Sequence, residues 1–334
     1  MADYLHAVGG RREFLDALAG QQLLTYFQPV VELATGAVRG AESLLRWQHP
    51  RRGLLPAAAF LAPYENSPVM KSLTWFVLRE ACLAMAEGAP PSWSVSVNVT
   101  AADAGRGDLV DQVAAALDLS GLAPQRLVLE VTETGLLTNP VRAAEVLSRI
   151  RDTGVGISLD DFGTGYSSLR LLRELPISEL KIDALFVAEV ETSDSDAAIV
   201  SNVVQLADAF GATVVAEGVE RPGQAARLHQ LGCGFGQGYL WSRPAPLDQV
   251  VGLRVAPVPP ALPAPERCQT EPVLELTTKV GSLLCAGASL HSIAAALNAD
   301  GLRTTQGRRW HATSVSLLLA ELGLAPPTRP PGAN

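Results

Sequence analysis

Short apolar segments alternate with segments of helical periodicity along most of the chain. The apolar segments predict strands at residues 23–33, 38–45, 94–99, 127–131, 156–159, 180–183 and 213–217, with a last short strand or loop at 234–240. Apolar positions three and four residues apart predict helices at residues 11–18, 56–61, 71–86, 108–117, 141–151, 196–210 and 224–230. Strands that alternate with helices in this way predict βα units and a parallel sheet.

The number of predicted strands favours a barrel. Roughly eight strands over about 250 residues is the size of an α/β fold of the (β/α)8 TIM type. The alternative is an open doubly wound sheet, which is weakened because no glycine-rich dinucleotide loop follows the first strand. Thr35-Gly36 predicts a turn, so we expect the first two strands to form an antiparallel hairpin. We place this barrel domain at residues 1–254.

The composition changes after the barrel domain. Residues 255–272 are rich in proline and predict an extended, semi-rigid linker. Helical patterns at 273–284, 290–298 and 313–322 then predict a small three-helix module at residues 273–325, followed by a tail at 326–334. Gly301 is placed to end the second of these helices. Three short helices of this kind can form a helix-turn-helix.

The stretch from Leu159 to Leu169 carries the strongest candidate chemistry. Two adjacent carboxylates, Asp160 and Asp161, follow an apolar strand and precede a turn with two glycines. Like charges side by side are unfavourable unless a positive group lies between them, and divalent cations prefer carboxylate oxygens. The alternative is a polar turn in which Ser167 and Ser168 begin a helix.

Further polar residues fall at or near the carboxyl ends of the other predicted strands. They are Glu42, Asn98, Glu130, Lys181, Glu217 and Gln237. In a barrel these strand ends meet on one face, where active sites are built. Such an oxygen-rich site suits Mg²⁺ or Mn²⁺ rather than zinc, which favours His and Cys. Two metal ions could clamp a phosphodiester, with Lys181 holding water or stabilising charge and Arg46 binding a phosphate oxygen.

These residues lie in motifs that follow one another in a fixed order. The motifs are Glu42-Ser43-Leu44-Leu45-Arg46-Trp47, Asn98, Glu130-Val131-Thr132-Glu133, Asp160-Asp161-Phe162-Gly163-Thr164-Gly165, Leu180-Lys181-Ile182-Asp183, Ala216-Glu217-Gly218-Val219-Glu220 and Gln237-Gly238-Tyr239. The ordered set resembles the EAL-domain family of cyclic di-GMP phosphodiesterases over about residues 12–252. The resemblance implies a modified barrel whose first strand runs antiparallel to the others. It also implies two Mg²⁺ or Mn²⁺ ions, hydrolysis of cyclic di-GMP to linear pGpG, and a homodimer formed through the barrel.

The resemblance further implies roles for the matching residues. The residues that would bind one metal ion are Glu42, Asn98, Glu130 and Asp160, and Asp160 with Asp161 would bridge to the second ion. Glu217 would act as the general base, or bind the water at the metal, and Lys181 would orient that water.

The remaining matches concern the substrate and one loop. Gln28 and Arg46 would contact the substrate, and Gln237 and Glu220 would support the site and the substrate. Glu133 would hold the loop after Asp161. The alternatives are that Glu220 and Glu133 are solvated loop acids or helix caps and that Gln28 simply closes the first strand. Trp47 and Tyr239 are interpreted as packing residues rather than stacking platforms.

Two positions depart from the family pattern. Ser43 replaces the usual Ala, and we expect a small effect provided that its hydroxyl finds a partner. Gly234 stands where the family often has Asp, which would loosen the last βα turn. None of the metal-binding acids is missing, so we favour an active enzyme. The alternative is a receptor that binds cyclic di-GMP without cutting it.

Residues 293–315 resemble part of the DNA-binding region of large serine recombinases. The catalytic domain of those enzymes has no counterpart here, so recombination is not expected. Arg303, Arg308 and Arg309 could contact phosphates, which would make DNA the partner of residues 273–325. The alternative is a regulatory or dimerising helical module with a protein partner.

Net charge and cysteine spacing limit the kinds of partner and the cellular compartment that we expect for this protein. A net charge of −8 argues against a protein whose whole surface binds nucleic acid. The four cysteines lie far apart without metal-type spacing, which indicates reduced thiols in a cytoplasmic protein. The first residues include Arg11, Arg12 and Glu13 without an apolar signal core, and no apolar run is long enough to cross a membrane.

Overall fold

The computed structural model describes residues 11–64, 67–132, 140–162 and 174–253, and in the C-terminal part residues 255, 280, 283, 288–302 and 309–321. The chain divides into two compact units, Met1–Leu262 and Pro263–Asn334. The division falls within the proline-rich segment 255–272.

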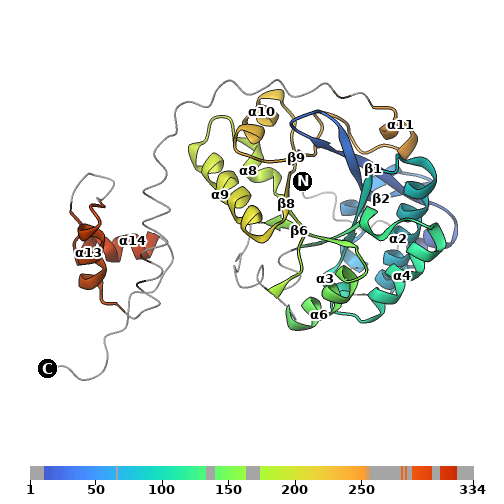
Figure 1. The fold of residues 1–334 in the computed structure, drawn as a ribbon. Helices are drawn as coiled ribbons and strands as arrows, with labels where there is room; N and C mark the ends of the chain where they lie inside the picture. The colour runs from blue at the N-terminus through green and yellow to red at the C-terminus, as the bar shows by residue number, and fades with distance from the viewer. Residues whose placement is uncertain are drawn as a thin grey trace. The chain divides into compact units, whose positions relative to one another are not determined.

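Eight strands of the first unit form a closed barrel (Figure 1). They are β1 (Leu23–Glu32), β2 (Val38–His49), β4 (Ser94–Val99), β5 (Leu127–Thr132), β6 (Gly156–Phe162), β7 (Glu179–Ile182), β8 (Thr213–Ala216) and β9 (Phe235–Gly236). β1 pairs antiparallel with both β2 and β9, whereas the remaining neighbours pair parallel. This closure confirms the predicted barrel with an antiparallel first strand and excludes the open doubly wound sheet.

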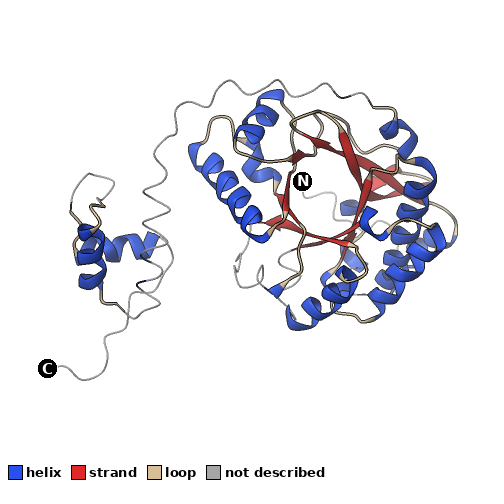
Figure 2. Cartoon of the chain, viewed as in Figure 1, coloured by secondary structure: helices blue, strands red, loops and turns tan. Residues whose placement is uncertain are grey.

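Helices surround the barrel (Figure 2). They are α1 (Arg11–Ala19), α2 (Val69–Gly88), α3 (Ala101–Ala104), α4 (Asp108–Ser120), α6 (Pro140–Arg151), α8 (Ala184–Ala188), α9 (Asp194–Phe210), α10 (Pro222–Gln230) and α11 (Leu247–Val251). Their apolar faces and the strands bury one continuous core that includes Leu129, Leu147 and Ile157. Within the described part of the chain, no helix is long and apolar enough to cross a membrane.

β2 is longer than the sequence predicted, and its end is covered on one side. The added residues Arg46 to His49 pair with a short strand, β3 (Gly53–Pro56). The fully buried Trp47 packs edge-on against Phe14 of α1 and against Phe60. The helix predicted at residues 56–61 is wrong, because β3 runs to Pro56 and only the short 3-10 helix Ala57–Ala59 follows.

The second unit has its own small core. α13 (Leu290–Ala299) and α14 (Ala312–Glu321) bury Ile293, Leu297, Trp310 and Val315 together with Val280. Gly301 ends α13 with a left-handed φ of 78°, as predicted. Most of the helix predicted at residues 273–284 lies outside the described residues, so a three-helix module stays a prediction.

Candidate metal centre and active site

The barrel brings the sequence-predicted residues together at one face. Glu42, Asn98, Glu130, Asp160 and Lys181 lie on β2, β4, β5, β6 and β7, respectively. Two further residues, Glu217 and Gln237, follow β8 and β9 directly. Parallel strands place their carboxyl ends at the same face of a barrel, so residues far apart in sequence meet there.

Lys181 lies at the centre of these carboxylates. Its side chain is buried, and its Nζ lies 2.5 Å from Glu217 Oε1 and 3.0 Å from Glu130 Oε2. Glu42 Oε2 and Asp160 Oδ1 are 3.3 and 3.9 Å away. Burial would lower the pKa of Lys181, but the surrounding carboxylates outweigh burial and hold it well above its ordinary value. One permanent positive charge therefore faces four acidic groups.

Glu42 is the best-stabilised carboxylate of the group. Its Oε1 accepts a hydrogen bond from Asn98 Nδ2 at 2.6 Å, and its Oε2 accepts one from Gln237 Nε2 at 2.7 Å. Burial alone would raise the pKa of Glu42, but Lys181 and these amide donors more than offset burial and lower it. Gln28 lies opposite Glu42 across the β1–β2 pair and accepts a hydrogen bond from the same Gln237 amide. Glu42 is therefore charged and held in place at neutral pH.

The other acids of the group hold their protons more strongly than ordinary carboxyl groups. Burial raises the pKa of Glu130 well above its ordinary value, and repulsion from Glu42 adds to the effect. Burial raises the pKa of Asp160 in the same way. The pKa of Glu217 rises to about 7, mainly by burial, and that of Asp161 rises to about 6 through burial and the adjacent Asp160. A site whose acids resist ionisation has room for additional positive charge.

The donor set fits a divalent metal ion. Carboxylate oxygens of Asp160, Asp161 and Glu217 all lie within 4.8 Å of one another. Gln237 adds a buried side-chain oxygen that has no hydrogen-bond partner among the described residues. All of these are oxygen ligands, which hard cations such as Mg²⁺ and Mn²⁺ prefer.

A backbone irregularity allows the two adjacent aspartates to share this site. Side chains of neighbouring residues in a regular strand point to opposite faces. The pairing of β6 with β7 shifts register between Leu159 and Phe162, and Asp161 has a left-handed φ of 56°. The sequence predicted that the strand ends at Leu159, but β6 continues to Phe162 through this bulge. Such bulges next to active sites redirect side chains, and here a carboxylate oxygen of each aspartate lies within 4.8 Å of the other.

A pocket of about 390 Å³ opens beside the carboxylates. Its lining includes the predicted substrate residues Gln28, Glu220 and Gln237, together with Tyr239. Tyr239 is 49% exposed, and the Arg243 guanidinium lies 4.1 Å from its ring centroid. Tyr239 therefore lies at the edge of the pocket, whereas Trp47 packs in the core as predicted. Arg243 is not among the residues predicted from the sequence, since a single exposed arginine in a loop carries no pattern.

Two predicted parts of the site need separate mention. Arg46 lies on β2, with its guanidinium 5.9 Å from the ring centroid of Tyr26. Its contact with the substrate stays a prediction. Glu133 and residues 163–173, which include Ser167 and Ser168, lie outside the described residues.

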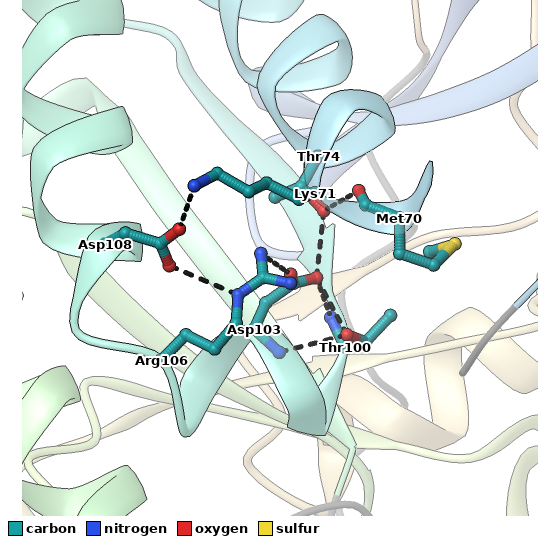
Figure 3. Close-up of polar contacts among 7 residues, drawn as sticks. All are labelled: Met70, Lys71, Thr74, Thr100, Asp103, Arg106 and Asp108. Carbon is teal, nitrogen blue, oxygen red and sulfur yellow. Dashed lines mark hydrogen bonds and ion pairs between the residues drawn. The ribbon is translucent and has the colours of Figure 1, made fainter. Parts of the chain in front are cut away.

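A buried polar network follows β4 directly (Figure 3). Thr100 and Asp103 form a reciprocal capping box at the start of α3: the Thr100 hydroxyl accepts from the Asp103 N–H, and the Asp103 carboxylate accepts from the Thr100 N–H. The carboxylate also accepts from the Thr74 hydroxyl of α2 at 2.8 Å and pairs with Arg106 at 2.6 Å. Asp103 is fully buried, so this one side chain connects the turn to α2.

The network supports the end of β4 where β2 no longer does. The pairing of β2 with β4 stops at Ser43 and Val97, whereas β5 continues to pair at Asn98 and Glu130. Asn98 is therefore held by a neighbouring strand on one side only. The anchored turn that begins two residues later limits fraying of this strand end.

Ser43 provides a prediction about stability. Its side chain is buried and its hydroxyl has no hydrogen-bond partner among the described residues, so the condition for a small effect is not met there. We expect Ser43→Ala to raise the free energy of unfolding by about 1 kcal/mol, because a buried unsatisfied hydroxyl is removed. Chemical denaturation measures the change, and a loss of stability would contradict it. At Gly234, the other departure from the family pattern, there is space for a side chain, since an added Cβ would meet nothing within 4 Å.

The acidic cluster predicts how the stability of the metal-free protein depends on pH. The pKa values of Glu130, Asp160, Asp161 and Glu217 are raised in the folded state. Their contribution to stability is complete below the ordinary carboxyl pKa and is lost as pH rises through about 6 to 7, whereas Glu42 acts in the opposite direction. We expect the unfolding midpoint in chelator to fall by about 5 °C between pH 5.5 and 8. Differential scanning calorimetry measures it, and Mn²⁺ should reverse the fall at pH 8. A midpoint that rises with pH would contradict the account.

Comparison with known proteins agrees with this geometry. The sequence model of the EAL domain family matches residues 11–244. MucR of Pseudomonas aeruginosa, described as a bifunctional diguanylate cyclase/cyclic di-GMP phosphodiesterase, is 42% identical over 238 residues, which are 70% of this chain and 35% of MucR. The cyclic di-GMP phosphodiesterase RocR of the same organism is 40% identical over 223 residues, 66% of this chain and 57% of RocR. This chain therefore spans only part of the length of these relatives.

The same similarity extends to three dimensions. A solved structure described as the PaMucR phosphodiesterase in complex with c-di-GMP superimposes with a TM-score of 0.68 at 41% identity, and the match covers 72% of this chain and 98% of that one. The EAL domain protein from Listeria monocytogenes superimposes with a TM-score of 0.65 at 29% identity. The closed barrel, the ordered acidic motifs and the family match over residues 11–244 together show that this chain belongs to the EAL domain family.

Proposed function

We propose that this chain is a divalent-metal-dependent phosphodiesterase that hydrolyses cyclic di-GMP to linear pGpG. The observation that carries the proposal is the group of four acids around Lys181. Three polar members of the site, Glu42, Asp160 and Glu217, line a pocket. The relatives described as cyclic di-GMP phosphodiesterases support the substrate. A metal-dependent diesterase needs oxygen ligands, a proton acceptor and groups that hold the substrate, and the barrel face supplies candidates for each.

Two Mg²⁺ or Mn²⁺ ions would be held by Glu42, Asn98, Glu130, Asp160 and Asp161. Ions bound there supply Lewis acidity to the phosphoryl oxygens and lower the pKa of water at the site. The amide of Asn98 now donates to Glu42, and rotation of this amide would present its oxygen instead. Gln237 holds Glu42 from the opposite side.

Glu217 is the proposed proton acceptor. In the metal-free site its pKa of about 7 lies near neutral pH, where a general base works best. Lys181 contacts Glu217 at 2.5 Å and would orient the attacking water while it offsets charge on the phosphate. Arg46 and Gln28 would contact the substrate, and Glu220, which also lines the pocket, would support it.

Product analysis separates this enzyme from a receptor that binds without cutting. Cyclic di-GMP is incubated with the full chain and Mn²⁺, and the product is identified by mass spectrometry, with binding measured in parallel by calorimetry. We expect the addition of one water and a single linear product, because one diester of the ring is cut. Binding without any product would favour the receptor, and neither binding nor product would reject both functions.

The C-terminal unit supports a second proposal, an interaction with DNA or with a protein through residues 273–325. Asn298 holds the backbone of Trp310 with two hydrogen bonds, of 2.8 and 2.9 Å, and Arg309 is exposed beside it. This bracing fixes the entry to α14, as a recognition helix requires. Failure of the full chain to retard DNA at low salt would reject DNA and leave a protein partner. Homodimerisation through the barrel and a cytoplasmic location stay predictions.

A further inference from the structure

The side chain of Gln224 in α10 uses all of its hydrogen-bond donors and acceptors to bind backbone groups. Its side chain is 1% exposed. Its Oε1 accepts hydrogen bonds from the N–H groups of Glu220 at 2.8 Å and Arg221 at 2.9 Å. Its Nε2 donates to the carbonyl oxygens of Val187 and Ala188, both at 3.1 Å. A carboxamide offers two donors and one oxygen with two lone pairs, so all four positions are used.

The four partner residues belong to the two segments that follow β7 and β8. Val187 and Ala188 end α8, which begins three residues after Lys181. Glu220 and Arg221 end the turn that begins at Glu217. Gln224 therefore joins the segment after the proposed water-orienting lysine to the segment after the proposed base.

The two segments are in direct contact as well. Gly218 has a left-handed φ of 65°, and a Cβ on it would lie 2.5 Å from the Cβ of Ala184. The N–H of Glu217 donates to the carbonyl of Ile182 at 3.0 Å. Both Ala184 and Gly218 line the pocket, so a shift of one segment changes the pocket wall that the other forms.

A cap for α10 would need only half of these contacts. At the third position of a helix, either Glu or Gln can accept from the N–H at the helix start. Of these two side chains, the glutamine amide can also donate to a second segment, whereas an ionised glutamate can only accept. The donation to Val187 and Ala188 therefore serves something other than the start of α10.

We propose that Gln224 is a positioning residue that fixes Lys181 relative to Glu217. The proposal rests on the proposed hydrolase, because it assigns Gln224 to the same reaction. Gln224 is not among the residues that line the pocket. It acts by holding the segment after β7 and the segment after β8 in fixed positions relative to each other. Misplacement of a catalytic group by about 1 Å can lower a rate by roughly 100-fold, so a small relaxation of the turns is sufficient.

The decisive variant is Gln224→Glu, which keeps the shape and the acceptor but removes both donors. We expect kcat for cyclic di-GMP to fall by about 10- to 100-fold while KM changes less than about threefold. Hydrogen exchange in metal-free protein should accelerate in residues 183–190, because the Val187 carbonyl loses its bond to Gln224 and the Ala188 carbonyl keeps only its bond to Arg221. Gln205→Glu on the exposed face of α9 is the charge control and should change neither quantity.

Arg126→Met is the matched control for stability. Arg126 also holds backbone carbonyls from separate positions, those of Met85, Pro90 and Trp93, but it does so at the opposite end of the barrel, just before β5 begins. Arg126→Met should lower the unfolding midpoint about as much as Gln224→Glu does. Its kcat, measured well below that midpoint, should stay within about twofold of the wild-type value.

The outcomes separate the proposal from the hydrolase on which it rests. An unchanged kcat in Gln224→Glu overturns the proposal, and so does an equal loss of kcat in Arg126→Met. If the wild-type chain binds cyclic di-GMP without turnover, the hydrolase fails. Hydrogen exchange then still decides whether Gln224 holds the two turns, and unchanged exchange in residues 183–190 rejects that role.

Discussion

Replacing Glu217 with glutamine should abolish hydrolysis of cyclic di-GMP, with a loss of kcat of at least about 1,000-fold. Glutamine keeps the size of the side chain but cannot accept a proton near neutral pH. Glu217 has a pKa of about 7 and contacts Lys181, so its loss removes the proposed base from the centre of the site. Initial rates of pGpG formation measure the effect.

Binding of cyclic di-GMP should persist in Glu217→Gln, since one negative charge is removed from an acidic pocket that receives an anionic substrate. Glu87→Gln on the exposed surface of α2 is the control and should retain the wild-type rate. Turnover within tenfold of wild type in Glu217→Gln would show that another group accepts the proton.

The second large effect is expected for Lys181→Met. Among the described residues, the ammonium group of Lys181 is the only cation that forms ion pairs with Glu42, Glu130, Asp160 or Glu217. Breaking a buried ion pair by removal of one partner typically costs about 3–5 kcal/mol. We expect a loss of that order in the unfolding free energy at pH 8 without metal, and a smaller loss at pH 5.5, where the acids take up protons.

Turnover should also fall by at least about 100-fold in Lys181→Met, because the attacking water loses its orienting group. Lys71→Met is the control. Lys71 pairs with Asp108 on the exposed surface, and the loss of such a pair typically changes stability by less than about 1 kcal/mol. Equal destabilisation by the two substitutions, measured by urea denaturation, would contradict the central place given to Lys181.

The sequence alone was sufficient to predict the barrel and most of the residues that lie on its acidic face. Alternation of strands and helices predicted βα units, and the strand ends located Glu42, Asn98, Glu130 and Lys181, because parallel strands in a barrel all end at one face. These residues carry strong local signals: an acid or amide at the end of an apolar strand. Their roles as ligands and bases stay predictions from the family resemblance.

Features that depend on tertiary contacts were not predictable in this way. β3 exists because the end of β2 offers an unpaired edge, whereas Pro56 and the alanines after it favour a helix locally. The bulge at Asp161 depends on the register with β7, which no local pattern reveals. Gln224 resembles any helix-starting glutamine until its contacts with Val187 and Ala188 are known.

The most direct test of the central claim is the rate of pGpG formation from cyclic di-GMP by the full chain, followed by chromatography with Mn²⁺ and then with excess chelator. We expect turnover with Mn²⁺, complete loss in chelator, and recovery when Mn²⁺ or Mg²⁺ is restored. Hydrolysis that continues unchanged in chelator, or the absence of product under all three conditions, would contradict a metal-dependent phosphodiesterase built on these carboxylates.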